Sequence, residues 1–171
     1  MRNCCFTVLQ GICDSVNKAG RSPRHLFILP GGIAEIFTST PGKNIVIFKE
    51  RRGLIKLALE TGTLLIPCYV FGASDVFHNF STGEGILSKL GRKYRIGGTM
   101  FFGHFGLPIP FAPRMTMCFA DPLSVVKWTG EGPVPNEMVD ALHTEYIQSL
   151  INLFEKYKAA AGHPTAVLEV R

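Results

Sequence analysis

The segment at 26–35, with the sequence LFILPGGIAE, constrains the fold of this chain more than any other. Four apolar residues lead into a Pro-Gly-Gly turn, a pattern that predicts a buried strand at 26–29. Paired glycines accept positive φ angles and let a ligand approach the backbone closely. Because sheet proteins commonly carry their sites on loops at the carboxyl ends of strands, we expect this strand to deliver Glu35 to a pocket. The alternative is a carboxylate that only complements a helix N-terminus.

Strand and helix patterns follow one another through the rest of the chain. Short apolar runs predict further strands, at 45–48, 64–71 and 115–120. Apolar residues at helical spacing predict a helix at 53–60, stopped by Gly62, and a long helix at 135–161. This order of elements indicates an α/β fold with a mixed, partly parallel sheet flanked by helices.

Three further segments carry weaker patterns. The residues at 6–16 predict a short amphipathic helix, and those at 83–96 predict a helix with a basic face. The basic helix is either a solvated surface or a contact for an anionic membrane. The segment at 97–113 is rich in glycine, phenylalanine and proline, which predicts an apolar loop. His104 in this loop is the most site-like of the five histidines, with a structural role as the alternative.

The composition limits the partners of the chain. Lys and Arg number 18 against 13 Asp and Glu, a net charge of +5 that favours anionic partners. There is no nucleic-acid-binding motif and no long block of basic residues, so nucleic acid is not expected as a partner. The five cysteines include no C-x-x-C pair, which argues against a zinc site. No apolar run reaches the roughly 18 residues of a membrane span.

Basic residues follow the glycine turn closely. Lys43 lies in a Pro-Gly-Lys-Asn turn, and Arg51 and Arg52 directly precede the helix at 53–60. Arginine binds phosphate in a bidentate manner and lysine binds it as a point charge. The three side chains are therefore candidates to hold phosphate groups, and a solvated basic surface is the alternative.

Six short motifs occur in order along the chain and carry a resemblance. They are PGGIAE at 30–35, PGKN at 41–44, RGLIKLAL at 52–59, LIPCYVFG at 65–72, LFEKYK at 153–158 and VLEV at 167–170. In this order and spacing they resemble the C-terminal half of the diacylglycerol acyltransferase type 2 family, which also contains monoacylglycerol acyltransferases and wax-ester synthases. The resemblance covers 26–171, whereas 1–25 match poorly.

The resemblance implies an acyltransferase-like domain at 26–171 that is the C-terminal portion of a larger domain. It implies an acyl-CoA-dependent O-acyltransferase that converts diacylglycerol to triacylglycerol, with acyl-CoA as co-substrate and without a cofactor or metal. In that family a histidine acts as general base toward the acceptor hydroxyl, and coenzyme A leaves. The implied location is the cytosolic face of the endoplasmic reticulum membrane or the surface of a lipid droplet.

The Gly-Gly-x-x-Glu element of the family maps onto this chain residue by residue. Glu35 is the expected catalytic residue. The predicted substrate-binding residues, which shape the pocket or approach the phosphates of coenzyme A, are Gly31, Gly32, Lys43, Arg51 and Arg52.

The chain also departs from the family pattern. The His-Pro-His-Gly motif is absent, since His163-Pro164 is followed by Thr165, and no histidine has an aspartate five positions later. We therefore expect a fragment of a longer enzyme that has little or no turnover by itself. The alternatives are a monoacylglycerol or wax-alcohol acyltransferase, and a non-catalytic membrane- or lipid-binding remnant of the family. The oligomeric state stays open.

Overall fold

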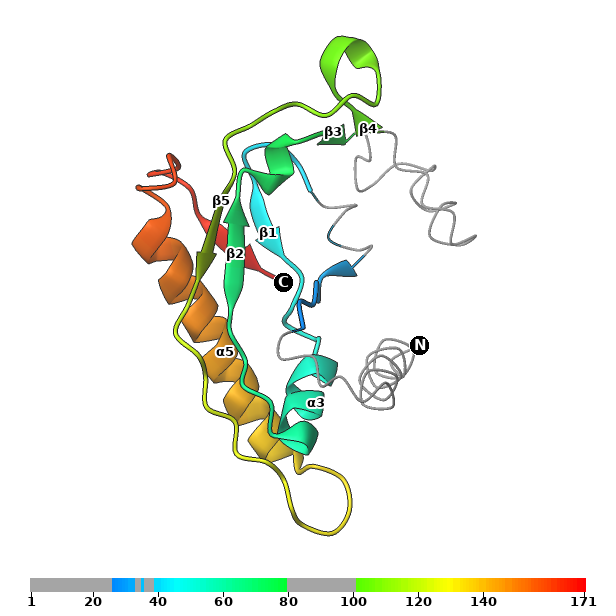
Figure 1. Ribbon diagram of the computed structural model, residues 1–171, viewed down its shortest axis with the longest axis vertical. Coiled ribbons are helices and arrows are strands. Elements are labelled where there is room, and N and C mark those ends of the chain that lie inside the picture. The colour runs from blue at the N-terminus through cyan, green and yellow to red at the C-terminus, as the bar shows by residue number, and fades with distance from the viewer. Residues whose placement is uncertain (1–25, 33–34, 36–38, 80–100) are drawn as a thin grey trace.

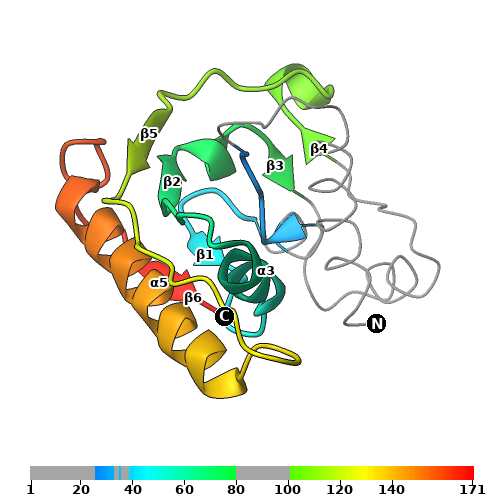
Figure 2. The ribbon, with the colours of Figure 1, turned by 60° about the horizontal axis from the view of Figure 1, so that its bottom comes forward.

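The computed structural model describes residues 26–32, 35, 39–79 and 101–171. Helix α5 (Asn136–Tyr157) is the longest element, and the two views of the ribbon show the strands and the second helix on one side of it (Figure 1, Figure 2). It confirms the helix predicted at 135–161, with turns in place of its last residues. Its buried residues recur at helical spacing because one face packs on the core. They are Val139, Leu142, His143, Tyr146, Leu150, Leu153 and Phe154.

Strands β2 (Cys68–Phe71) and β5 (Thr116–Phe119) form an antiparallel pair beside α5, as predicted for 64–71 and 115–120. The rings of Phe71 and Phe154 lie 5.1 Å apart in this packing. β2 is shorter than its apolar run because proline has no N–H to donate to a ladder. Before Pro67 the pairing continues only as an isolated bridge between Leu65 and Leu123.

Strand β1 (Asn44–Val46) pairs in parallel with β6 (Leu168–Val170), which confirms the predicted parallel component. The sequence did not predict β6, because three residues near Pro164 are too few for a strand pattern. Beyond the ladder, the Arg171 N–H donates to the Val46 carbonyl at 2.9 Å and the Phe48 N–H donates to the Arg171 carbonyl at 2.9 Å. The last residues of the chain thus fasten the segment that follows β1.

Helix α3 (Gly53–Thr61) packs against α5 and confirms the helix predicted at 53–60. It ends at Gly62, whose φ of 72° lies in the left-handed region that glycine enters without strain. Between α3 and α5 lies the fully buried Phe48. His143 stacks on the Phe48 ring at 5.1 Å and donates from Nε2 to the Phe48 carbonyl at 3.1 Å. This histidine has a structural role.

Four short elements lie away from α5. They are η1 (Ala73–Asp75), β3 (His78–Asn79), β4 (Phe101–Phe102) and η2 (His104–Gly106). β3 and β4 pair antiparallel, and η2 projects from them at the top of the molecule in Figure 1. The apolar loop predicted at 97–113 therefore contains a short strand and a turn of helix in its described part.

The prediction of a strand at 26–29 is wrong. These residues have no regular structure, and no described strand pairs with them. Leu26, Phe27 and Leu29 are exposed to solvent at the mouth of a cavity. A short apolar run does not by itself distinguish a strand from a segment whose side chains line a cavity.

The described strands form three separate two-stranded sheets within a mixed α/β structure. No described helix has the length and the apolar character required to cross a membrane. The helices predicted at 6–16 and 83–96 lie outside the described residues.

The packing on α5 makes a prediction about stability. Replacing the fully buried Phe154 by alanine leaves a cavity between the rings of Tyr69 and Phe71, which lie 5.1 Å from it. We expect Phe154→Ala to lower the free energy of unfolding by about 3–5 kcal/mol in urea titrations. Phe105→Ala removes the same ring where it is 95% exposed and should change stability by less than about 0.5 kcal/mol. Equal losses in both variants would contradict the packing described here.

Candidate functional site

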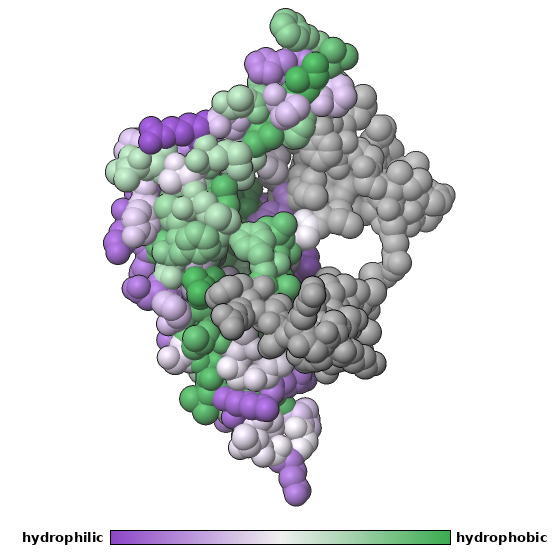
Figure 3. Space-filling model, viewed as in Figure 1, coloured by the Kyte–Doolittle hydropathy of each residue, from purple (hydrophilic) through white to green (hydrophobic). Residues whose placement is uncertain are grey.

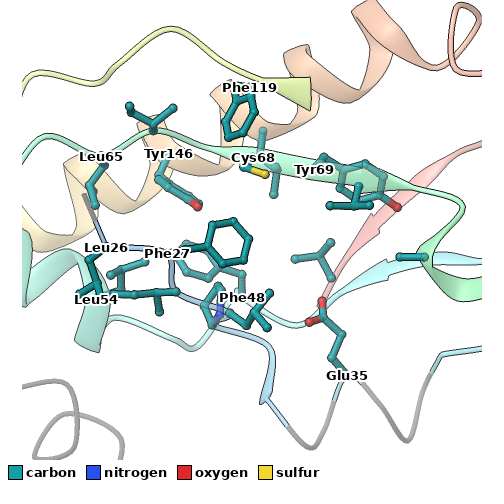
Figure 4. A pocket seen from close by; sticks show the side chains of 18 of the residues that line it. Leu26, Phe27, Glu35, Phe48, Leu54, Leu65, Cys68, Tyr69, Phe119 and Tyr146 are labelled. Carbon is teal, nitrogen blue, oxygen red and sulfur yellow. The ribbon is translucent and has the colours of Figure 1, made fainter. Parts of the chain in front are cut away.

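A cavity of about 880 Å³ lies between the segment at 26–30, helix α3, strands β1 and β2, and α5. Its volume falls in the range of about 300–1,000 Å³ that small-molecule sites occupy. The wall is largely apolar, and the labelled apolar residues of Figure 4 are Leu26, Phe27, Phe48, Leu54, Leu65 and Phe119. In Figure 3 apolar side chains gather on the face of the molecule over β2 and β5.

Glu35 projects into this cavity (Figure 4). Burial raises the pKa of its carboxyl above the ordinary 4.5, while a hydrogen bond from the Ile47 backbone and the charge of Arg51 act in the opposite direction. The side chain is half-buried, so the carboxylate is neither free in solvent nor sealed in the core.

Gly31 lies directly beneath this carboxylate. A methyl group at Gly31 would overlap the Glu35 side chain, so the close approach requires glycine. The Gly31 carbonyl accepts a hydrogen bond from Arg51 Nη2 at 3.1 Å. Gly32 has a φ of 58°, and a Cβ there would lie 3.9 Å from Arg51 Nη1. The structure thus brings Gly31, Gly32, Glu35 and Arg51 together.

The other two predicted substrate-binding residues lie apart from this group. Lys43 follows a turn whose Gly42 has a φ of 77°, and its exposed side chain lines the cavity. Arg52 points toward α5, where its Nε lies 2.8 Å from Asp140 Oδ1. Both partners are more than half exposed, so this ion pair contributes little to stability. Of the predicted site residues, only Glu35 and Lys43 line the cavity; Gly31, Gly32, Arg51 and Arg52 do not.

Two tyrosines and an asparagine add polar groups that the sequence did not single out. Tyr69 Oη donates to Asn44 Oδ1 at 2.9 Å, and burial, followed by the charge of Glu35, raises the pKa of its hydroxyl. Burial raises the pKa of Tyr146 to about 12, and its hydroxyl points into the cavity in Figure 4. Both tyrosines fit the strand and helix patterns as core residues, so only the three-dimensional arrangement reveals their hydroxyl groups as part of the cavity wall.

None of the histidines that the structure describes lines the cavity. His104 is exposed, and its ring lies 4.8 Å from that of Phe111. Within the same described residues, no three His, Cys, Asp or Glu side chains form a group that could hold a metal ion.

The raised pKa of Glu35 makes a prediction about pH. The folded chain binds this proton more tightly than the unfolded chain, so stability is lost as the pH rises from 4.5 through the raised pKa. Glu35→Gln removes the titration. We expect this variant to gain stability relative to the wild type over that pH interval in urea unfolding.

Glu169→Gln serves as the control of opposite sign. The hydrogen bond from Arg171 lowers the pKa of Glu169. The wild-type carboxylate therefore adds stability above the unfolded pKa, and Glu169→Gln should lose stability relative to the wild type as the pH rises. The assignment of Glu35 to a desolvated site is wrong if both variants change in the same direction.

The comparisons with known proteins agree with one another. A family model described as Diacylglycerol acyltransferase matches residues 6–171. The match therefore includes most of the segment at 1–25, which the motifs alone did not connect to the family. Diacylglycerol O-acyltransferase 2 from Homo sapiens is 34% identical over 180 residues, covering 94% of this chain and 45% of the relative. The same enzyme from Xenopus tropicalis is 35% identical, covering 94% of the chain and 49% of the relative. Diacylglycerol O-acyltransferase 2-like protein 6 from Homo sapiens is 32% identical, covering 93% and 52%.

The chain spans about half the length of these curated relatives. No solved structure gives a significant match. Because the family model matches nearly the whole chain, the chain belongs to the diacylglycerol acyltransferase family.

Proposed function

We propose that this chain forms part of an acyl-CoA-dependent O-acyltransferase that converts diacylglycerol to triacylglycerol. The observation that carries the proposal is an apolar cavity of about 880 Å³ in a chain of this family, with Glu35 as the one acidic residue among the described residues that line it. In the reaction the acceptor hydroxyl oxygen bonds to the thioester carbonyl carbon and the carbon–sulfur bond breaks. The hydroxyl proton passes to a general base, and the coenzyme A thiolate leaves and is protonated.

The cavity supplies the apolar environment that fatty substrates require. Each methylene group moved from water into such a site contributes about 0.8 kcal/mol, so a fatty chain gains most of its affinity from the wall itself. The hydroxyl groups of Tyr69 and Tyr146 are two polar groups of the wall that could orient an ester or thioester oxygen. A small number of polar groups in an apolar cavity is the usual arrangement of a specific small-molecule site.

We assign Glu35 an orienting role next to the general base. Its neighbours, Gly31 beneath it and Arg51 beside it, fix the carboxylate in one position. The 171 residues contain no His-Pro-His-Gly motif, and no described histidine lines the cavity. We therefore expect a histidine outside these 171 residues to act as the general base, and we expect little turnover from the chain alone.

The coenzyme A phosphates would approach the cavity on the side of Lys43 and Arg51. Lys43 lines the cavity, and Arg51 lies against the Gly31 carbonyl at 3.1 Å. Since both substrates are fatty molecules, we place the reaction at the cytosolic face of the endoplasmic reticulum membrane or at a lipid droplet.

A monoacylglycerol or wax-alcohol acceptor is the closest alternative, because acceptor choice depends on the shape of the same cavity. A non-catalytic lipid-binding protein is a second alternative, favoured by the absence of a described histidine at the cavity. Acyl transfer measured with diacylglycerol, monoacylglycerol and a long-chain alcohol separates the three. Binding of lipid without transfer to any acceptor would replace the enzyme by the binding protein.

The role of Glu35 can be tested by measuring acyl transfer in membranes from cells that express the protein from its natural transcript, with or without a substitution at residue 35. Glu35→Gln keeps the size of the side chain but removes the charge that sets its position. We expect kcat to fall by about 100-fold, as misplacement of a reacting group commonly costs, with a smaller change in KM. The control is Glu50→Gln, since Glu50 is exposed and does not line the cavity. Near-wild-type turnover by Glu35→Gln would remove Glu35 from the site.

Arg51 and Arg52 form a matched pair for a second test. Arg51→Ala removes a guanidinium beside Gly31, whereas Arg52→Ala removes one that pairs with Asp140. We expect only Arg51→Ala to raise the KM for acyl-CoA, by about tenfold for one lost charge-assisted contact, and the difference to shrink at high salt. A larger effect of Arg52→Ala would place the phosphates on the α5 side instead.

A further inference from the structure

An exposed apolar projection lies at one end of the described structure, away from α5. We call residues 104–110 the tip, and all seven are exposed. Phe105 is 95% exposed, Leu107 52% and Ile109 47%. The tip appears as the projecting turn at the top of Figure 1 and as green atoms in Figure 3. An uninterrupted exposed run of this kind is a liability in water unless it has a partner.

The backbone of the tip holds Phe105 outward in an unusual conformation. Phe105 has a φ of 59° and a ψ of 21°, the left-handed region that large side chains rarely enter. Gly106 follows with a φ of 73°, and a Cβ at Gly103 would overlap the Ile109 carbonyl. The chain thus folds back tightly and presents the ring at its apex. Strain of this kind persists where the surrounding structure imposes it, often at functional positions.

Most backbone N–H groups of the tip donate hydrogen bonds within the same turn. Gly103 N–H donates to the Leu107 carbonyl at 2.8 Å, and His104 N–H donates to the Ile109 carbonyl at 2.9 Å. The N–H groups of Gly106 and Leu107 also donate within the turn, and Pro108 and Pro110 have no N–H. Few backbone N–H groups of the tip therefore need water, which lowers the cost of moving the tip out of water.

The charges near the tip complete a profile suited to a membrane surface. Residues 101–113 contain no Asp, Glu, Lys or Arg, and the first charged residue after them is the exposed Arg114. An apolar segment flanked by arginine matches a bilayer, where hydrocarbon lies beneath a layer of phosphate groups. A specific protein partner would need polar contacts to define it, and the tip offers few.

We propose that the tip inserts into the acyl region of a phospholipid bilayer, with Phe105 deepest, and holds the chain at the membrane surface. The inference rests on and deepens the proposed function, because it names the segment that would hold the chain where water-insoluble substrates are dissolved. Its test measures vesicle binding, not turnover, so either proposal can fail while the other stands.

The first experiment is flotation of the chain with zwitterionic phosphatidylcholine vesicles, which minimise the contribution of basic segments. Phe105→Asp and Leu107→Asp should each lower the partition coefficient about ten- to a hundredfold, the equivalent of one large apolar side chain kept in water. The matched control, Val126→Asp, changes a residue that is 75% exposed outside the tip and should bind like the wild type. Binding of Phe105→Asp equal to that of the wild type would overturn the proposal.

A second experiment reports insertion directly. Phe105→Trp adds a fluorophore at the apex, and the signal of the native Trp128 is subtracted with the wild type. The added emission should shift to the blue with vesicles and be quenched by lipids brominated on their acyl chains. Unquenched emission from vesicle-bound protein would overturn the proposal. A second result would also overturn the proposal: Phe105→Asp binds vesicles like the wild type, but in the absence of lipid it sediments with a lower mass. The tip would then join two copies of the chain.

Discussion

Aromatic packing against one face of α5 is the interaction on which the rest of the described structure depends. Phe71 and Tyr69 surround Phe154 at one end of the helix, and Phe48 lies against Tyr146 and His143 further toward its beginning. The strands themselves are only two to four residues long, and isolated two-stranded ladders of that size are not stable in water. The strands therefore owe their positions to the helix, and not the helix to a sheet. Phe48 adds a direct link, because its carbonyl accepts a hydrogen bond from His143 across 95 residues of sequence.

The cavity follows from the same packing. Phe71 of β2 packs on Phe154 of α5, and Cys68 and Val70 of the same strand line the cavity, while Tyr69 does both. Tyr146 takes part in both environments, since its ring belongs to the buried cluster around Phe48 and its hydroxyl reaches the cavity. With a pKa raised to about 12 by burial, this hydroxyl keeps its proton at neutral pH and is a hydrogen-bond donor at all physiological pH values. A residue that looks like core from its helical position thus also sets the polarity of the cavity wall.

The sequence predicted the elements whose patterns are long or sharply ended. Helix α5 carries its apolar residues over many turns, and α3 ends at a glycine, so both were found close to their observed bounds. β6 was not predicted because three residues are too few to show a periodic pattern. The strand forms by pairing with β1, which lies more than a hundred residues earlier in the sequence. The strand prediction at 26–29 was wrong because the apolar side chains of this segment line a cavity and its backbone pairs with no described strand. Among the candidate site residues, Glu35 lies over Gly31, as expected for residues this close in sequence. Adjacent Arg51 and Arg52 diverged, because neighbouring residues at a helix start point in different directions and only Arg52 reaches Asp140.

Gly31, the Glu35 carboxyl group and Arg51 form one geometric unit beside the cavity. The side chain of Glu35 lies over the backbone of Gly31, since a Cβ added at Gly31 would overlap its carboxyl group. Any side chain at 31 would push the Glu35 carboxylate off this position, whereas glycine lets it lie against the backbone. The Gly31 carbonyl then anchors Arg51, whose charge offsets part of the desolvation that raises the pKa of Glu35. Burying a carboxylate beside an apolar cavity is costly unless such partners are present. The arrangement therefore holds a partly desolvated carboxyl group at the wall of an apolar cavity, with Gly31 and Arg51 as its neighbours.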